Sequence, residues 1–138
     1  MTTPPGFDAA RVVVDTDLVI DFLRGKGAGS RLVPGLVAER RFTVTAVTAF
    51  ELRVGTDFMP RRDRIGRLLN QPTLPFDVAS ALEAGRIASA LGAAGTPIGM
   101  ADCMQAGMCI RYRMPFATRN RKHFDRIDGL DLVGLPEE

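Results

Sequence analysis

The sequence contains few of the residues that zinc proteins and disulfide-bonded proteins need. It has one histidine and two cysteines, Cys103 and Cys109, in 138 residues, and no CxxC pair. This argues against a zinc site. The cysteines fall six residues apart in one predicted helix, so about 9 Å separates them along its axis, too far for a disulfide. We therefore predict that both are small core residues of a protein from a reducing compartment.

Long apolar runs are also missing. None approaches the roughly 18 residues that a membrane span needs, and the first residues lack the basic and apolar regions of a signal peptide. We predict a cytoplasmic protein without a membrane span, in which residues 1–138 form a single domain and residues 1–10 a loose leader.

The charge is nearly balanced, with a net value of +2. This is too small to indicate nucleic-acid binding by itself. All but two of the 18 basic residues are arginine, which binds phosphate in a bidentate manner. A GC-rich genome explains the same bias, and we give that explanation more weight.

Short apolar runs alternate with helical patterns along the chain, which has no internal repeats. Strands are predicted at 11–14, 42–45, 73–76 and 115–118, with a last edge strand at 130–133. Helices are predicted at 16–24, 31–39, 60–69 and 101–113, around Val47, Phe50 and Val54, after Asp77 with a stripe of Ala84, Ile87, Ala88 and Leu91, and as a short basic turn at 120–126. The alternation predicts an α/β fold, with a mostly parallel sheet of four to five strands between helices.

Three carboxylates occupy unusual positions. Asp15 directly follows the apolar run 12–14, at the strand end where such folds bind ligands. Glu51 has apolar neighbours at helical spacing, and a buried charge there is costly unless it is paired or binds a metal. Asp102 opens another predicted helix. If the three converge, they form a negative site suited to a hard divalent cation, Mg²⁺ or Mn²⁺, and to phosphate chemistry.

Each carboxylate also has a purely structural interpretation. Asp15 could cap the following helix, Glu51 could pair with an arginine such as Arg53, and Asp102 could interact favourably with its helix dipole. Asp17 and Asp21 are interpreted as first-turn acids or a solvated face.

A further candidate segment follows the fourth predicted strand. Thr118 and Asn120 could hydrogen-bond a metal-bound water or a phosphate, and Thr16 offers a hydroxyl beside Asp15. The cations Arg119, Arg121 and Lys122 suit an RNA backbone, although a solvated basic turn explains them equally well. His123 is interpreted mainly as structural, with proton transfer as the alternative.

These residues together resemble the PIN-domain ribonucleases, in particular the VapC toxins of bacterial toxin–antitoxin pairs. The matching segments are Val13-Val14-Asp15-Thr16-Asp17-Leu18-Val19-Ile20-Asp21, Thr48-x-x-Glu51-Leu52-x-x-Gly55, Ile98-Gly99-x-x-Asp102, and Thr118-Arg119-Asn120 to His123-Phe124 followed by Gly129-Leu130. The resemblance covers residues 11–133 and implies a PIN-like three-layer fold, an Mg²⁺- or Mn²⁺-dependent endoribonuclease, a homodimer and a VapB-type antitoxin that restrains it.

By position, the resemblance makes Asp15, Glu51 and Asp102 the family's three core acids. Asp15 and Asp102 would bind the metal directly, Glu51 directly or through water. Many members carry a fourth acid in the last of these matching segments, which begins at Thr118 and is called the closing segment below. Here Asn120 or His123 stands at that place and Asp125 is shifted, which puts a second tightly held metal in doubt.

Two alternatives remain at this point. The segment Asp15-Thr16-Asp17 also resembles the opening of haloacid-dehalogenase-like phosphatases, with Asp15 as nucleophile and Asp17 as acid/base, but their later acid pair is missing. The other alternative is a PIN-like module that binds RNA or protein without cutting it.

Overall fold

The computed structural model describes residues 10–136, and the predicted leader falls almost entirely outside this range. The elements in chain order are β1 (Val12–Val14), α1 (Thr16–Arg24), α2 (Gly27–Ala38), β2 (Phe42–Thr45), α3 (Ala46–Val54), α4 (Phe58–Leu69), β3 (Thr73–Leu74), α5 (Val78–Ala93), α6 (Met100–Tyr112), β4 (Phe116–Ala117) and α7 (Arg121–Phe124).

The four strands form one sheet in the order β3-β2-β1-β4, and every pairing is parallel. The register places Val13 opposite Thr43 of β2 and opposite Phe116 of β4. β1 is therefore central, and the residue that follows it lies at the middle of the sheet's carboxyl edge. The predicted three-layer α/β fold is confirmed.

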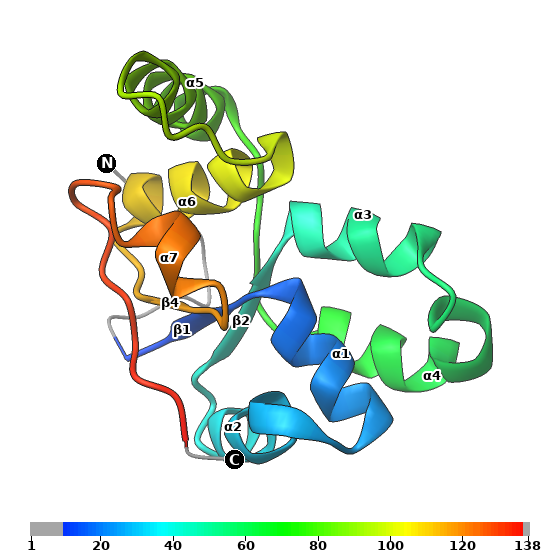
Figure 1. The fold of residues 1–138 in the computed structure, drawn as a ribbon. Coiled ribbons are helices and arrows are strands. Elements are labelled where there is room, and N and C mark those ends of the chain that lie inside the picture. The colour runs from blue at the N-terminus through cyan, green and yellow to red at the C-terminus, as the bar shows by residue number, and fades with distance from the viewer. Residues whose placement is uncertain (1–9, 137–138) are drawn as a thin grey trace.

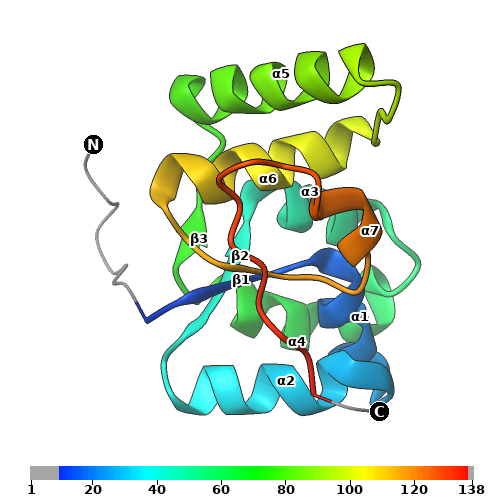
Figure 2. The same ribbon diagram turned by 60° about the vertical axis from the view of Figure 1, so that its left-hand side comes forward.

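Helices cover both faces of the sheet (Figures 1 and 2), with α1, α2 and α4 on one side and α5 and α6 on the other. β1 shows how the sequence allows this, because successive side chains of a strand point to opposite faces. Val12 and Val14 pack into the first core with Leu18 and Phe42. Val13 packs into the second core, which includes Ile87, Met108 and Phe124. An unbroken valine run is what a strand buried on both faces needs.

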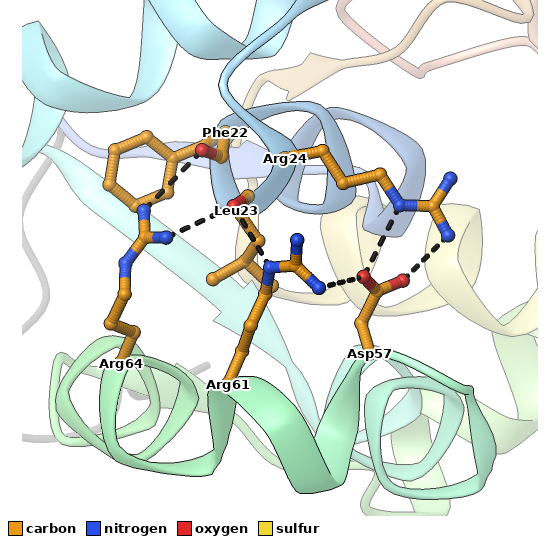
Figure 3. A network of polar contacts seen from close by, with 6 residues as sticks. All are labelled: Phe22, Leu23, Arg24, Asp57, Arg61 and Arg64. Carbon is orange, nitrogen blue, oxygen red and sulfur yellow. Dashed lines mark hydrogen bonds and ion pairs between the residues drawn. The ribbon is translucent and has the colours of Figure 1, made fainter.

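The carboxyl end of α1 is held by arginines from α4 (Figure 3). Arg61 Nε and Arg64 Nη1 both donate to the Leu23 carbonyl, at 3.1 and 3.0 Å. Asp57 accepts hydrogen bonds from Arg24 and Arg61, and the Arg24 hydrogen bond lowers the pKa of Asp57 below its ordinary value. The last carbonyls of a helix have no partner within it. The two arginines satisfy the Leu23 carbonyl, and together with the ion pairs of Asp57 they fix α1 against α4.

Several predicted boundaries were wrong. The helix expected at 31–39 begins at Gly27 and keeps Pro34 inside it. The helix expected from Pro60 begins at Phe58 and is kinked, with non-helical dihedral angles at Arg61. The third strand stops at Leu74 rather than at 76, because Pro75 has no N–H to donate. The last edge strand is reduced to one bridge between Phe116 and Leu132.

Two predicted helix faces were also partly wrong. In α5, Ala84, Ile87 and Leu91 are buried, but Ala88 is exposed and Ser80 takes a buried place instead. In α3 the buried residues are Thr48 and Leu52, whereas Phe50 and Val54 are 68% and 69% exposed. Glu51 therefore does not lie on a buried apolar face, because two of the apolar neighbours on which that prediction rested, Phe50 and Val54, are exposed.

The prediction that the two cysteines are core residues without a disulfide is confirmed. Cys103 and Cys109 are both free and buried, and burial raises the pKa of each thiol. Among the helices that the structure describes, none is both long and apolar enough to cross a membrane.

Candidate active site at the carboxyl edge of the sheet

Asp15 lies where β1 meets α1 and is 6% exposed. Its Oδ1 accepts a hydrogen bond of 2.7 Å from the Thr16 backbone N–H, and its Oδ2 accepts one of 2.7 Å from the Thr118 hydroxyl, which follows β4. A capping side chain usually accepts from the second or third helical N–H, whereas Thr16 is the first residue of α1. Asp15 thus occupies the cap position without the usual capping bond.

The charge on Asp15 is poorly compensated. Burial is the largest influence and raises its pKa from 3.8 to about 6. The nearby carboxylates Asp17 and Asp102 raise the pKa further, while the hydrogen bonds from Thr118 and Thr16 lower it. A buried acid with acids around it is an environment that a cation would stabilise.

Glu51 reaches the same place from α3. Its Oε1 accepts a hydrogen bond of 2.7 Å from the Thr16 hydroxyl, and the backbone N–H of that threonine binds Asp15. Glu51 is partly buried, so one oxygen is held by the protein while the side chain still meets solvent. The predicted alternative, a pair with Arg53, is not what holds it, because Arg53 lies over the Phe58 ring.

Asp102 is in the first turn of α6, as predicted, and its side chain is 28% exposed. Its Oδ2 lies 3.3 Å from Nδ1 of His123, which belongs to the short helix α7. Asp102 also raises the pKa of Asp15, which places the two carboxylates within electrostatic range. His123 therefore stands beside a candidate metal ligand.

The closing segment is more tightly bound to the protein than the sequence suggested. Arg119 lies 3.2 Å from Oδ1 of Asp21 and 3.9 Å from Oδ2 of Asp17. The interpretation of Asp21 as a solvated acid was wrong, since it is 5% exposed and also accepts from the Gly29 N–H. Arg119 compensates Asp21, and its charge is directed there rather than at Asp15.

The other predicted residues of this segment lie on its outer side. The Asn120 backbone N–H donates to the Thr118 hydroxyl at 3.0 Å, and Arg121 donates to the Val133 carbonyl at 2.9 Å. Lys122 and His123 are exposed. The segment therefore orients Thr118 toward Asp15 and presents Lys122 to solvent.

The three acids face one region without closing on each other. Within residues 10–136, no group of three or more His, Cys, Asp or Glu side chains lies close enough to hold a metal ion. The donors are nevertheless carboxylate oxygens, the ligands that Mg²⁺ prefers, and Asp15 carries the uncompensated charge that a cation would neutralise. The residues therefore fit such an ion chemically.

Sequence reasoning missed the buried hydroxyl and amide groups behind Glu51. Thr16 Oγ1 is 2.8 Å from Thr48 Oγ1, and Thr48 is bound in turn by Gln105, which also accepts from Thr45. The signal for Thr48 was its place three residues before Glu51, on the same helix face. For Gln105 the only signal was the same spacing after Asp102.

Comparison with known proteins agrees with this geometry. The sequence pattern of the PIN domain matches residues 12–130. The chain is 29% identical over 125 residues to the tRNA(fMet)-specific endonuclease VapC of Shigella flexneri, covering 87% of this chain and 94% of that protein. It is 30% identical over 97 residues to the protein of the same name from Salmonella typhimurium, covering 67% and 74%.

A solved structure has the same fold. The chain is similar to a chain in the crystal structure of DNA-bound VapBC from Salmonella typhimurium, with a TM-score of 0.76, 21% identity, and coverage of 89% of this chain and 96% of that one. At this identity the likeness concerns the fold.

Proposed function

The chain belongs to the PIN-domain family and is a relative of the VapC endonucleases, and we propose that it is a metal-dependent endoribonuclease that acts as the toxin of a toxin–antitoxin pair. The observation that carries this proposal is Asp15, a buried carboxylate at the carboxyl edge of the sheet whose pKa is raised to about 6. The family membership replaces the phosphatase interpretation, in which Asp17 would be the acid/base.

Asp15 and Asp102 are the residues that would hold Mg²⁺ or Mn²⁺, with Glu51 binding directly or through water. When bound, the ion supplies positive charge to the RNA phosphate and makes a coordinated water more acidic. Glu51 is held through Oε1 by Thr16, so its Oε2 would be the oxygen left to orient a water beside the RNA phosphate. Thr118 keeps Asp15 turned toward the site through its 2.7 Å hydrogen bond.

The closing segment has supporting roles in this proposal. Lys122 is exposed and can contact the RNA backbone. Arg119 and Arg121 already bind the protein itself, so they contribute to RNA binding mainly through the local positive charge. The Asn120 side chain would contact the phosphate or a water, and His123 would orient Asp102 from 3.3 Å away.

The proposed partners follow from the relatives. RNA is the substrate, and initiator tRNA is the first to test, because the VapC relatives are specific for tRNA(fMet). A VapB-type antitoxin would restrain the enzyme, as the VapBC neighbours are complexes of this kind. An RNA-cleaving toxin with such a partner would act in the cytoplasm. The antitoxin is expected to be encoded by a small open reading frame just upstream of the gene.

The proposal predicts that the purified chain cleaves RNA with Mg²⁺ or Mn²⁺ and not with EDTA. Asp102→Asn should lose this cleavage, because it removes one charged metal ligand. The measurement is a gel assay on initiator tRNA, elongator tRNA and total RNA, with circular dichroism to show that the variant is folded. A folded wild-type chain that binds RNA but yields no metal-dependent product would contradict the enzyme and favour the non-catalytic binding module.

A homodimer is the second part of the proposal, supported by exposed apolar side chains beside the site. Phe50 is 68%, Met100 74% and Phe76 37% exposed, and all three line one groove of about 530 Å³ together with Glu51. Large exposed apolar patches on soluble proteins usually mark an interaction surface. A second copy of the chain would cover these residues and enclose the edge of the site.

We expect Phe50→Glu to convert the dimer to a monomer at micromolar concentration, because it places a charge in the centre of the apolar groove. Light scattering coupled to size exclusion measures this directly. Met59→Glu is the matched control, since Met59 is 59% exposed but lies on α4 outside the groove. A monomeric wild-type chain, or equal disruption by both variants, would show that this groove is not the dimer surface.

A further inference from the structure

Gln105 is a buried polar residue of α6 that has a hydrogen-bond partner at each end of its side-chain amide. It is 1% exposed. Its Oε1 accepts a 2.5 Å hydrogen bond from the Thr45 hydroxyl, and its Nε2 donates a 2.9 Å hydrogen bond to Thr48 Oγ1. A buried amide without partners would be strongly destabilising. Thr45 and Thr48 supply the partners that offset this cost.

The hydrogen atoms of this cluster can be assigned by counting donors. Thr16 has one hydroxyl hydrogen, which goes to Glu51 Oε1, a carboxylate oxygen that can only accept when ionised. In the 2.8 Å contact between Thr16 and Thr48, Thr48 must therefore donate. Because the Thr48 hydrogen is then used, Thr48 can only accept from Gln105, which requires the Nε2 end of the amide to face it.

The reverse orientation of the amide fails this count. With Oε1 facing Thr48, the Thr48 hydroxyl would have to donate to both Gln105 and Thr16 with one hydrogen. The only consistent arrangement runs in one direction, from Thr45 through Gln105, Thr48 and Thr16 to the carboxylate of Glu51. Hydrogen bonds aligned in this way polarise one another, and the last of them fixes the position of Glu51 Oε1.

The same series of hydrogen bonds connects the three parts of the fold that carry the acids. Gln105 lies one helical turn after Asp102 on α6. Thr48 and Glu51 belong to α3, and Thr16 of α1 also binds Asp15 through its backbone N–H. A change at Gln105 would therefore alter both the position of Glu51 and the distance between Asp102 and the other acids. Gln105 itself is buried and does not contact the site.

We propose that Gln105 is a positioning residue that prepares Glu51 and the acid-bearing helices for metal binding, acting through Thr48 and Thr16. The proposal rests on the function given above. Groups one layer behind metal ligands are typically worth about 10- to 100-fold in metal affinity or activity. Because Gln105 acts through two intermediaries, the expected effect is at the lower end, about tenfold.

The test compares Gln105→Met, Thr48→Val and Thr48→Ser with the wild type. Met and Val keep the volume but lose the hydrogen bonds, and Ser restores the hydroxyl. Thr43→Val is the matched control. Thr43 lies on β2, the strand that also carries Thr45, and it is fully buried with no hydrogen-bond partner for its hydroxyl. The readouts are Mn²⁺ affinity by titration calorimetry, kcat and KM for RNA, and the melting temperature.

Gln105→Met and Thr48→Val are expected to bind Mn²⁺ about tenfold more weakly and to lower kcat while KM for RNA stays near the wild-type value. Thr48→Ser should recover both, and Thr43→Val should leave both unchanged. Variants that melt earlier yet keep wild-type Mn²⁺ affinity and kcat would overturn the proposal. If Gln105→Met does not fold, Thr48→Val decides the question, and a wild type without Mn²⁺ binding would instead contradict the proposed function.

Discussion

Asp15→Asn is expected to abolish RNA cleavage while making the metal-free protein more stable at neutral pH. The activity loss should exceed about 100-fold, since even groups behind metal ligands are worth about 10- to 100-fold and Asp15 is proposed to touch the metal itself. The gain in stability follows from burial, which raises the pKa of Asp15 from 3.8 to about 6. The two effects have opposite signs because the charge that would bind the cation destabilises the fold without it.

The direction of the pH dependence can be derived from this pKa. The folded protein holds the Asp15 proton to a higher pH than the unfolded chain does. The free energy of unfolding therefore falls as pH rises from about 4 to about 6, and remains at the lower value above that range. A pKa difference of this size corresponds to about 3 kcal/mol. The asparagine variant should lack this fall and be more stable by about 2 to 3 kcal/mol at pH 7.

Urea unfolding between pH 4 and 8, in EDTA and in Mn²⁺, measures both effects. Mn²⁺ should stabilise the wild type and leave Asp15→Asn unchanged, because only the wild type binds it. Asp63→Asn is the control for loss of one negative charge, since Asp63 is exposed on α4. A variant that is less stable than the wild type at pH 7 in EDTA would contradict the argument from burial, whatever its activity.

The sequence predicted this site well where a residue's position in a strand or helix was decisive. Asp15 follows a strand whose valines alternate between two cores, so its place at the central carboxyl edge follows from local pattern and parallel topology. The helix 16–24 and the strand 42–45 were predicted with the observed bounds. Such features depend on neighbouring residues and could be recognised from them.

Other features depend on contacts between distant segments and could not be predicted. Glu51 was singled out because its neighbours are apolar, yet Phe50 and Val54 are exposed, and Glu51 is held by Thr16, 35 residues earlier. Asp21 was interpreted as a first-turn acid or part of a solvated face, yet it is 5% exposed. Its partner Arg119 comes from the other end of the chain. The relation between Gln105 and Thr48 joins α6 to α3 in the same way.

The second large effect is expected at Gly29, where α2 packs against α1. A Cβ on Gly29 would lie 1.9 Å from the Leu18 carbonyl oxygen and 2.7 Å from Asp21 Cβ. The first of these is backbone, so a rotamer change cannot relieve the clash and the two helices must separate. We expect Gly29→Ala to destabilise the protein by about 3 kcal/mol, the upper part of the range for overpacking, and to lower its melting temperature by about 10 °C.

Gly35→Ala on the same helix is the matched control, because a Cβ there meets nothing within 4 Å. It should stabilise the protein by about 0.5 to 1 kcal/mol, since alanine favours a helix over glycine. Thermal unfolding of both variants provides the comparison, and equal melting temperatures would refute the close approach of the helices.

The consequence of Gly29→Ala for the site follows from Asp21. The Gly29 N–H donates to Asp21 Oδ2 at 3.3 Å, and Asp21 binds Arg119. Arg119 is the neighbour of Thr118, whose hydroxyl holds Asp15. Moving α2 away from α1 should therefore loosen the closing segment as well as the fold, and Mn²⁺ affinity should fall in Gly29→Ala even at temperatures where the variant is folded. Retention of wild-type Mn²⁺ affinity there would show that the closing segment is positioned independently of the helix pair.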